Sequence, residues 1–318
     1  MRKIIVLFII NIYSNIFSQQ EGLFTQYMFN PSILNPAYTV SNANPMLFLQ
    51  QRTQWGDLEG APQTNFLNFN HPSLFNNLGL GVSIVNDNLG PVNDFSSSFD
   101  LSTLVRINDN WNTSLGLKFS YNVLNVNFDI LNIYNPNDPY FLNSIEDQGS
   151  FNLGFGVFLY SEESYVGFSS PYVFKNNHFD SESVLYKATD EQHFYLTAGH
   201  VFQLKNDIKL KPSIITRYVS NLPLQLDFSV NAFFFEKFIL GTSHRINSAF
   251  SFLAGFYASK NLMIGYSHDA ETNRLKDFAG NSSEFFLKWE ITPKEIINPR
   301  FFWWETFWFS YFSLLHLK

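Results

Sequence analysis

The sequence of 318 residues contains no cysteine. This absence excludes disulfide bonds, thiolate metal sites and cysteine-based catalysis, although it does not identify a cellular compartment. Charged residues are also scarce, at 15% of the chain, which is fewer than a soluble enzyme usually carries. The formal net charge is -7 and no basic patch is present, so we expect no nucleic-acid partner.

Long apolar runs are missing as well. A transmembrane helix needs about 18–20 consecutive apolar residues, and no uninterrupted segment reaches that length. The segment from Phe301 to Leu317 comes closest, but polar residues such as Glu305 and Ser310 interrupt it. The mean hydropathy of -0.08 is also far below that of a helical membrane protein.

The N-terminus has the features of a secretory signal peptide. Arg2 and Lys3 form a positive region, and the apolar stretch from Ile4 to Ile12 is too short to span a bilayer. Ser18 offers a small residue at a cleavage site. We therefore assign residues 1–18 to a signal peptide, and we expect no lipid anchor because no cysteine follows it.

Aromatic residues are abundant, with 37 Phe and 15 Tyr, and many lie in segments that alternate with a period of two. In the segment 224–232, apolar side chains at the even positions alternate with Gln225, Asp227, Ser229 and Asn231. Alternation of this kind predicts β-strands with one apolar and one polar face. A membrane barrel with a lipid-facing outer wall and a wet lumen has this pattern.

We predict about 14 such strands, and an even number is typical of a single-chain bacterial barrel. They cover residues 46–54, 64–71, 78–87, 95–106, 111–124, 150–160, 164–170, 193–203, 208–218, 224–235, 238–246, 249–258, 262–269 and 284–291.

The lengths of the connections support this prediction. The even-numbered connections are all short (72–77, 107–110, 161–163, 204–207, 236–237 and 259–261), whereas the odd-numbered ones include every long one (125–149, 171–192 and 270–283). Short periplasmic turns and long extracellular loops are the rule for outer-membrane barrels. This parity places both termini in the periplasm.

The strands of a large soluble β-sandwich would also alternate apolar and polar residues, but such a fold has no reason to place its short and long connections at opposite ends. The predicted fold is therefore all-β: a transmembrane antiparallel β-barrel of about 14 strands. The predicted organisation is a signal peptide (1–18), an N-terminal plug or periplasmic segment (19–45), the barrel (46–291) and an aromatic C-terminal tail (292–318).

Several motifs follow one another in a fixed order. The first is Phe-Thr-Gln-Tyr-Met-Phe-Asn-Pro-Ser-Ile-Leu-Asn-Pro-Ala-Tyr at 24–38, and others stand at 54–55, 60–64, 71–72, 79–91, 135–139, 166–171, 265–266 and 298–302. In order and spacing these motifs resemble the PorP/SprF family of outer-membrane proteins, which is associated with type IX secretion and gliding motility. The resemblance covers residues 19–302.

The resemblance implies a non-enzymatic barrel without cofactors that binds, anchors or helps to export secreted surface proteins through their C-terminal signal domains. It also implies contacts with periplasmic components of the type IX system and with outer-membrane lipid.

The chain departs from the family pattern at two places. Ser282-Ser283-Glu284 lacks the histidine usual before the last strand, and the chain continues beyond Phe302 through an aromatic tail. Because weakly charged aromatic segments prefer the membrane interface, we expect this tail to lie on the inner leaflet.

No catalytic constellation is evident. The seven histidines are scattered, without the spacing of a zinc protease. His268, Asp269 and Glu271 lie together at a strand end, but neighbours on a strand point to opposite faces, so a polar strand terminus is the simpler interpretation than a metal site.

The segment 86–91, Asn-Asp-Asn-Leu-Gly-Pro, has calcium-like residues but lacks the spacing of an EF-hand loop, so it is better interpreted as a turn. The segment Phe24 to Tyr38 is interpreted either as a plug in the lumen or as a periplasmic docking patch. The cost of leaving its bulky apolar groups in water favours the plug, with turns at Asn30-Pro31 and Asn35-Pro36. The candidate partner-binding residues from both segments are Phe24, Tyr27, Asn30, Pro31, Asn35, Pro36, Tyr38, Asn86, Asp87, Gly90 and Pro91.

Charged residues on the polar strand faces are expected to line the lumen: Asp100, Arg106, Lys118, Lys209, Lys211, Arg217, Asp227, Arg245, Lys288 and Glu290. They form either a polar network in a filled lumen, which we favour, or the lining of a pore. The leading functional hypothesis is thus a secretion-linked barrel that binds partners. A general porin or solute channel is the alternative, and an outer-membrane enzyme is the third hypothesis.

Overall fold

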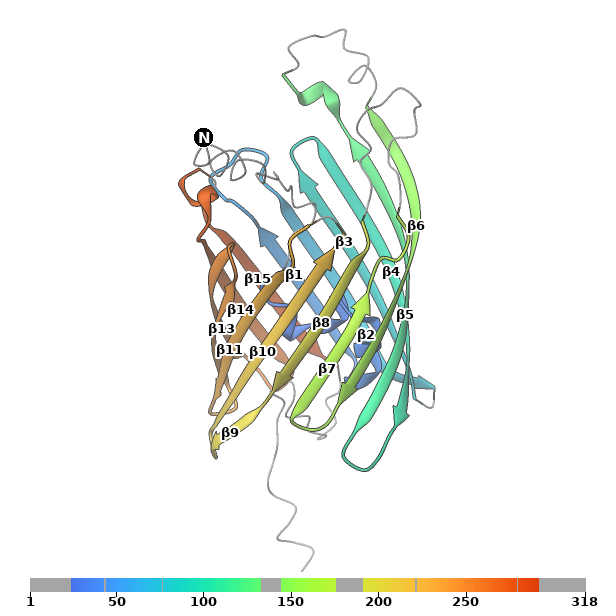
Figure 1. Cartoon of the computed structure of the whole chain (residues 1–318), viewed down its shortest axis with the longest axis vertical. Coiled ribbons are helices and arrows are strands. Elements are labelled where there is room, and N and C mark those ends of the chain that lie inside the picture. Colours follow the sequence, from blue (N-terminus) through green and yellow to red (C-terminus); the bar gives the residue numbers. More distant parts are fainter. Residues whose placement is uncertain are drawn as a thin grey trace, which may run out of the picture.

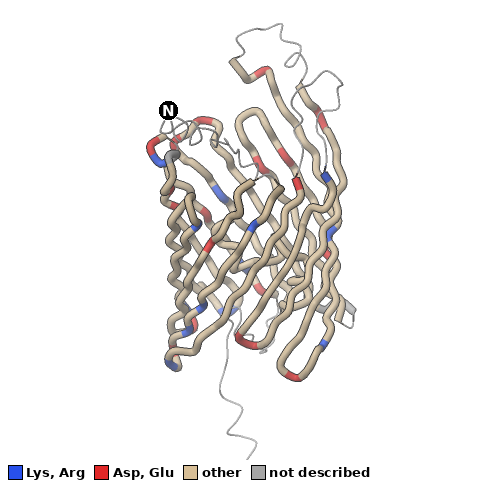
Figure 2. The backbone as a smooth tube through the Cα atoms, viewed as in Figure 1, with Lys and Arg blue, Asp and Glu red and all other residues tan. Residues whose placement is uncertain are grey.

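Within the residues that the structure describes, fifteen β-strands form a single antiparallel sheet that closes on itself (Figures 1 and 2). The computed structural model describes residues 24–42, 44–75, 77–132, 144–175, 191–220, 222–278 and 280–291. The strands are β1 (Met46–Thr53), β2 (Gln63–Phe75), β3 (Leu78–Leu89), β4 (Val92–Arg106), β5 (Asn112–Val126), β6 (Ile145–Tyr160), β7 (Ser164–Ser170), β8 (His193–His200), β9 (Phe202–Lys205), β10 (Ile208–Val219), β11 (Gln225–Phe234), β12 (Phe238–Arg245), β13 (Ala249–Tyr257), β14 (Leu262–Glu271) and β15 (Ser282–Glu290).

The wall of the barrel has 14 strand positions, because β8 and β9 occupy one position. The two strands are separated by Val201 alone, and both pair with β10. The sheet closes where β1 pairs with β15, from Met46↔Glu290 to Thr53↔Ser283, and where β10 pairs with β11. The predicted antiparallel β-barrel of about 14 strands is confirmed.

The side chains alternate between lumen and outer wall as the period-two pattern predicts. In β13 every odd-numbered residue from Ala249 to Tyr257 is buried, whereas Phe250, Phe252 and Phe256 are exposed on the outside. Most of the large exposed apolar side chains lie on this outer wall. Because lipid solvates such side chains and water does not, the surface suits a bilayer.

The connections between strands differ in length at the two ends of the barrel. The even-numbered connections are short (76–77, 107–111, 161–163, 206–207, 235–237 and 258–261), and we call their end the short-turn rim. The odd-numbered ones include all the long ones (54–62, 127–144, 171–192 and 272–281), and we call their end the long-loop rim. The predicted parity therefore holds with the observed strand ends.

Strand β6 begins five residues earlier than predicted, at Ile145 instead of residue 150. The residues Ile145-Glu-Asp-Gln-Gly149 carry no alternating apolar pattern, and they pair with β5 through the backbone across an irregularity in register. Asp147 has a φ of 48° at this irregularity. The strand is therefore extended here by backbone pairing with β5, and not by a side-chain pattern.

Five 3-10 turns complete the described elements: η1 (Tyr27–Phe29), η2 (Pro31–Ile33), η3 (Pro36–Ser41), η4 (Phe128–Ile130) and η5 (Arg274–Asp277). Within the described ranges, no helix has the length and apolar character needed to cross a membrane. The signal peptide at 1–18 and the aromatic tail at 292–318 lie outside the described residues, so both stay predictions.

Engineered cysteines test which rim faces the cell exterior. The chain has no cysteine, so Asp129→Cys in the long 127–144 connection and Asp109→Cys in the short 107–111 turn each give a single thiol at an exposed position. We expect a membrane-impermeant maleimide to label Asp129→Cys in intact cells, and Asp109→Cys only after the outer membrane is permeabilised. The opposite labelling pattern would show that the short-turn rim, and not the long-loop rim, faces the cell exterior.

Candidate functional site

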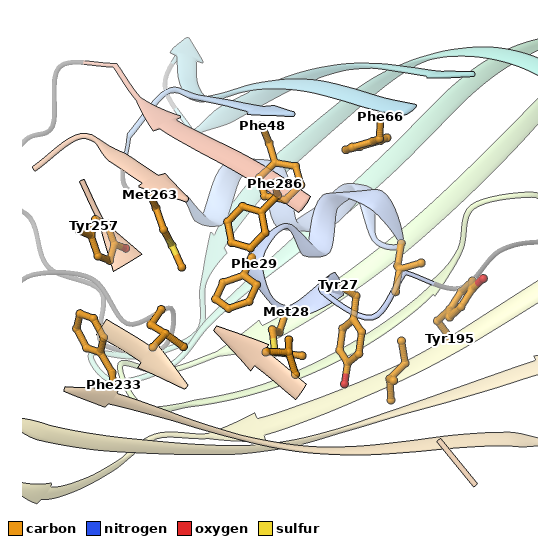
Figure 3. Packing of buried hydrophobic residues seen from close by; sticks show 14 residues of the cluster. Tyr27, Met28, Phe29, Phe48, Phe66, Tyr195, Phe233, Tyr257, Met263 and Phe286 are labelled. Atoms are coloured by element: carbon orange, nitrogen blue, oxygen red, sulfur yellow. The ribbon is translucent and has the colours of Figure 1, made fainter. Parts of the chain in front are cut away.

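Residues 24–41, which we call the luminal segment, lie inside the barrel between its walls (Figures 1 and 3). Almost every residue from Thr25 to Ser41 is buried, polar ones included. Five of the candidate partner-binding residues are buried there, and the sixth, Pro31, is half-buried: Tyr27, Asn30, Pro31, Asn35, Pro36 and Tyr38. They therefore contact the barrel itself, where the plug interpretation places them.

The two Asn-Pro pairs shape the luminal segment. Pro31 and Pro36 stand at the first positions of η2 and η3, where a fixed φ suits the turn and no N–H is needed. Asn35 caps η3, because its side-chain oxygen accepts a hydrogen bond from the Ala37 N–H at 3.0 Å. The two predicted turns are therefore present.

A cluster of buried charges holds the start of the luminal segment. Arg52 on β1 lies between Asp269 on β14 and Glu284 on β15, with its Nη1 at 2.8 Å from Asp269 Oδ2 and hydrogen-bonded to Glu284 Oε1. The backbone N–H groups of Thr25 and Gln26 donate to the Glu284 carboxylate at 2.6 and 3.1 Å. The Thr25 hydroxyl donates to Asp269 at 2.7 Å. We call Arg52, Asp269 and Glu284 the Arg52 cluster.

Below this cluster, η1 packs into an aromatic core. The Phe29 ring lies 4.8 Å from that of Phe286, which stacks on Phe48 at 5.2 Å (Figure 3). Met28 Sδ accepts a hydrogen bond from Asn231 Nδ2 at 2.8 Å. Burial raises the pKa of the Tyr27 hydroxyl to about 12, so the phenol stays neutral inside the lumen.

Glycines in the wall make room for η3. A Cβ at Gly116 on β5 would lie 2.6 Å from Ala37 Cα and 2.5 Å from the carbonyl carbon of Pro36. A Cβ at Gly79 on β3 would lie 2.7 Å from Val40 Cα. These distances are shorter than van der Waals contact, so the wall is shaped to fit the backbone of the luminal segment.

Most of the charges predicted to face the lumen do so. Nine of the ten are buried: Asp100, Lys118, Lys209, Lys211, Arg217, Asp227, Arg245, Lys288 and Glu290. Lys118 pairs with Asp100 at 2.9 Å, and Arg245 pairs with Asp227 at 2.8 Å. Arg106 lies on the same face of β4 as Asp100 but is exposed, because it ends the strand at the short-turn rim, beyond the enclosed part of the lumen.

Above the luminal segment, the barrel opens into a partly polar hollow at the long-loop rim. Its lining includes Phe24, Asp94, Tyr172, Glu191 and His193. Phe24, the first described residue, thus lies at the rim opposite Glu290, where β15 ends. The predicted periplasmic position of both termini concerns residues outside the described ranges and stays a prediction.

The candidate residues at 86–91 occupy the hairpin between β3 and β4 at the same rim. Gly90 has a φ of 54° and donates its N–H to the Gly60 carbonyl at 2.8 Å. Asp87 accepts a hydrogen bond from the Thr64 hydroxyl at 2.7 Å. The turn predicted over 86–91 is thus limited to Gly90-Pro91, because Asn86 to Leu89 continue β3 and pair with β4. The hairpin brings these residues to the rim, away from the buried η1–η3.

The described residues bring no set of three His, Asp or Glu side chains together in a geometry that would hold a metal ion. His268 and Asp269 point to opposite faces of β14, and Glu271 accepts a hydrogen bond from Trp55 Nε1 at 3.2 Å. Their arrangement is that of a polar strand end.

One Ser–His pair does occur. Ser164 Oγ lies 2.7 Å from His200 Nδ1, near the short-turn rim. In the described part of the chain no carboxylate hydrogen-bonds to this histidine, so the pair lacks the third group that orients the base in hydrolases.

Sequence reasoning missed Arg52, Thr25 and Gln26 as members of one site. Arg52 is the one charged residue of β1, and Ser283, beside Glu284, stands where the family pattern has a histidine. Those two signals mark unusual positions, but only the closure of β1 on β15 pairs Arg52 with Glu284.

Comparison with family models matches residues 16–289 to the family described as type IX secretion system membrane protein PorP/SprF. A search of curated proteins gives no match. Among solved structures, the CymD monoaromatic hydrocarbon channel aligns with a TM-score of 0.51 and 11% identity, over 86% of this chain and 95% of that chain. A Pseudomonas aeruginosa FadL homologue aligns with a TM-score of 0.45 and 12% identity, over 82% and 92%. The first likeness shows the barrel fold alone.

Removing the Arg52 guanidinium is expected to destabilise the barrel strongly. Arg52→Ala leaves the buried carboxylates of Asp269 and Glu284 uncompensated, and breaking such a pair costs about 3–5 kcal/mol. Urea titration of the protein in liposomes measures the loss of stability. Lys260→Ala, in an exposed turn, is the matched control and should change stability by less than about 0.5 kcal/mol. Equal stability of the two variants would contradict this role.

The luminal segment is expected to block conduction. In planar bilayers the whole chain should show no steady large conductance, whereas a chain without residues 24–41 should show stepwise openings, because the space it fills becomes water. Gly116→Ala provides a milder test, since its Cβ meets the backbone of Pro36 and Ala37. The Cβ of Gly255→Ala is nearest to the flexible end of Met263, at 3.0 Å, and lies 3.3 Å from the Ile264 carbonyl oxygen, so it does not touch the luminal segment. More frequent openings in Gly255→Ala than in Gly116→Ala, or a large conductance of the unaltered chain, would contradict the prediction.

Proposed function

Because the chain belongs to the PorP/SprF family of type IX secretion system membrane proteins, we propose that this outer-membrane barrel holds exported surface proteins through their C-terminal signal domains. The proposed role is non-enzymatic, and the barrel binds periplasmic components of the same system. The family membership supports a role in secretion, and the choice of a holding role rests on the arrangement of the lumen.

The observation that carries the proposal is the occupied lumen. The luminal segment is anchored by the Arg52 cluster, packed on Phe286 and Phe48, and fitted against wall glycines. A barrel filled in this way leaves its rims and outer wall as the surfaces available to other molecules. This arrangement supports binding to partners over passage of solutes.

The long-loop rim is the proposed binding surface for the exported protein. Asn86, Asp87, Gly90 and Pro91 lie there at least partly accessible, beside the hollow lined by Asp94 and Glu191. The buried candidates, such as Tyr27 and Tyr38, contribute indirectly by fixing the luminal segment beneath that rim. Their proposed part in partner binding is therefore positional.

The proposal is tested by affinity purification of the tagged protein from crosslinked outer membranes, followed by mass spectrometry. We expect recovery of a large secreted protein together with its C-terminal domain and periplasmic secretion components. The same tag on a porin of the same membrane is the control. Recovery of the barrel alone, under conditions that preserve known complexes, would favour the solute-channel hypothesis instead.

A further inference from the structure

The outer wall of the barrel has a shallow hollow over β15, β1, β2 and β3. Leu49 and Gln51 on β1, Asn65 on β2 and Phe285 on β15 line it from exposed positions. These side chains alternate along their strands with buried ones such as Arg52, which face the lumen. The hollow therefore opens on the face of the wall that meets the bilayer, and we call it the outer-wall hollow.

Three carboxamides form the part of the outer-wall hollow that lies nearer the long-loop rim. The strand register places Gln51 opposite Asn65, and Asn65 opposite Asn86. Side chains opposite each other in this way have Cβ atoms about 5 Å apart, so the three amides form a continuous row. Gln51 and Asn65 are exposed, so their amide groups are presented to molecules around the wall.

The other part of the outer-wall hollow is a row of aliphatic side chains. Leu49 pairs with Leu287 on one side and with Leu67 on the other, and Leu67 pairs in turn with Ile84. Leu49 is 41% exposed and Ile84 is 37% exposed. Hydrocarbon solvates such side chains favourably, whereas a carboxamide loses hydrogen bonds when it enters hydrocarbon. The boundary between the hydrocarbon and the polar headgroups therefore crosses this hollow.

The position of the hollow identifies a lipid as its occupant. The hollow is continuous with the apolar outer surface that lipid covers in a barrel of this kind. An amphiphile can place an acyl chain on the aliphatic row and, at the same time, its polar linkage on the carboxamide row. One molecule thus matches both rows.

The chemistry of the hollow selects among lipids. The described residues that line it include no Lys or Arg, which are the residues that usually bind lipid phosphates. The connection 54–62 at the adjacent rim adds only negative charge, from Asp57 and Glu59. A carboxamide both donates and accepts hydrogen bonds, as an acyl amide or a sugar hydroxyl does, whereas the acyl esters of a phospholipid only accept them. The carboxamide row therefore fits an acylated amino sugar better than a phospholipid.

We propose that the outer-wall hollow binds an acylated amino sugar of the outer leaflet, a glycolipid of the lipid A type. An acyl chain packs on Leu49, Leu67 and Ile84. The acyl amide and the sugar hydroxyls hydrogen-bond to the carboxamides of Gln51 and Asn65. This inference rests on the long-loop rim facing the cell exterior, which the cysteine labelling above tests, and it is independent of the proposed holding function.

The first test measures the lipid preference of the purified full chain in detergent by native mass spectrometry. Lipid A and phosphatidylethanolamine, in equal amounts, are the competing probes. Asn65→Leu removes one carboxamide from the hollow at an exposed position of the wall. Gln63→Leu removes one from an exposed position on the same face of β2, two residues away and outside the hollow, so it is the matched control.

We expect the unaltered chain to prefer lipid A by at least about fivefold, the effect of one or two additional hydrogen bonds. Asn65→Leu should lower this preference about three- to fivefold and Gln63→Leu less than about twofold, since only the former loses such a bond. Removal of the lipid A phosphates should leave the preference unchanged. Equal preference in the two variants, or a preference that disappears with the phosphates, would overturn the proposal.

Photo-crosslinking in intact outer membranes identifies the occupant directly. A photoreactive phenylalanine analogue in place of Leu49 lies in the hollow, and the same analogue in place of Phe252, which is 60% exposed on the outer wall of β13, is the control. We expect a lipid A adduct that is more abundant at the first position than at the second. An adduct with a phospholipid, with the chain's own C-terminal tail or with a second copy would each overturn the proposal.

Discussion

Every backbone N–H and C=O of the wall must find a partner within the sheet, because a bilayer offers none. The structure meets this constraint by joining β1 to β15 and β10 to β11. Closure also decides the faces: with a period of two, each strand turns one set of side chains to lipid and the other to the lumen. The apolar outer wall, the polar inner wall and the position of the luminal segment all follow from closure.

Closure creates a second requirement, since an inner wall of polar and charged residues needs either water or polar partners. The luminal segment supplies partners in part of this space. The carboxylate of Glu284 is compensated by Arg52 and by the backbone N–H groups of Thr25 and Gln26. Removing the Arg52 guanidinium would leave the buried carboxylates without a countercharge. Loosening the fit between the luminal segment and the wall glycines would cost only van der Waals contacts. The charged cluster is therefore the stronger determinant of where the segment starts, and the glycines determine how closely it lies against the wall.

The fold was predictable from the sequence because both of its signals are local. Alternation in segments such as 224–232 and the parity of connection lengths need no knowledge of contacts. Asn35-Pro36 likewise predicted a turn from two neighbouring residues. The Arg52 cluster was not predictable, since its three members are far apart in the sequence and meet only through closure of the sheet. The early start of β6 escaped prediction for a related reason: residues 145–149 pair by backbone alone, and their side chains carry no strand pattern.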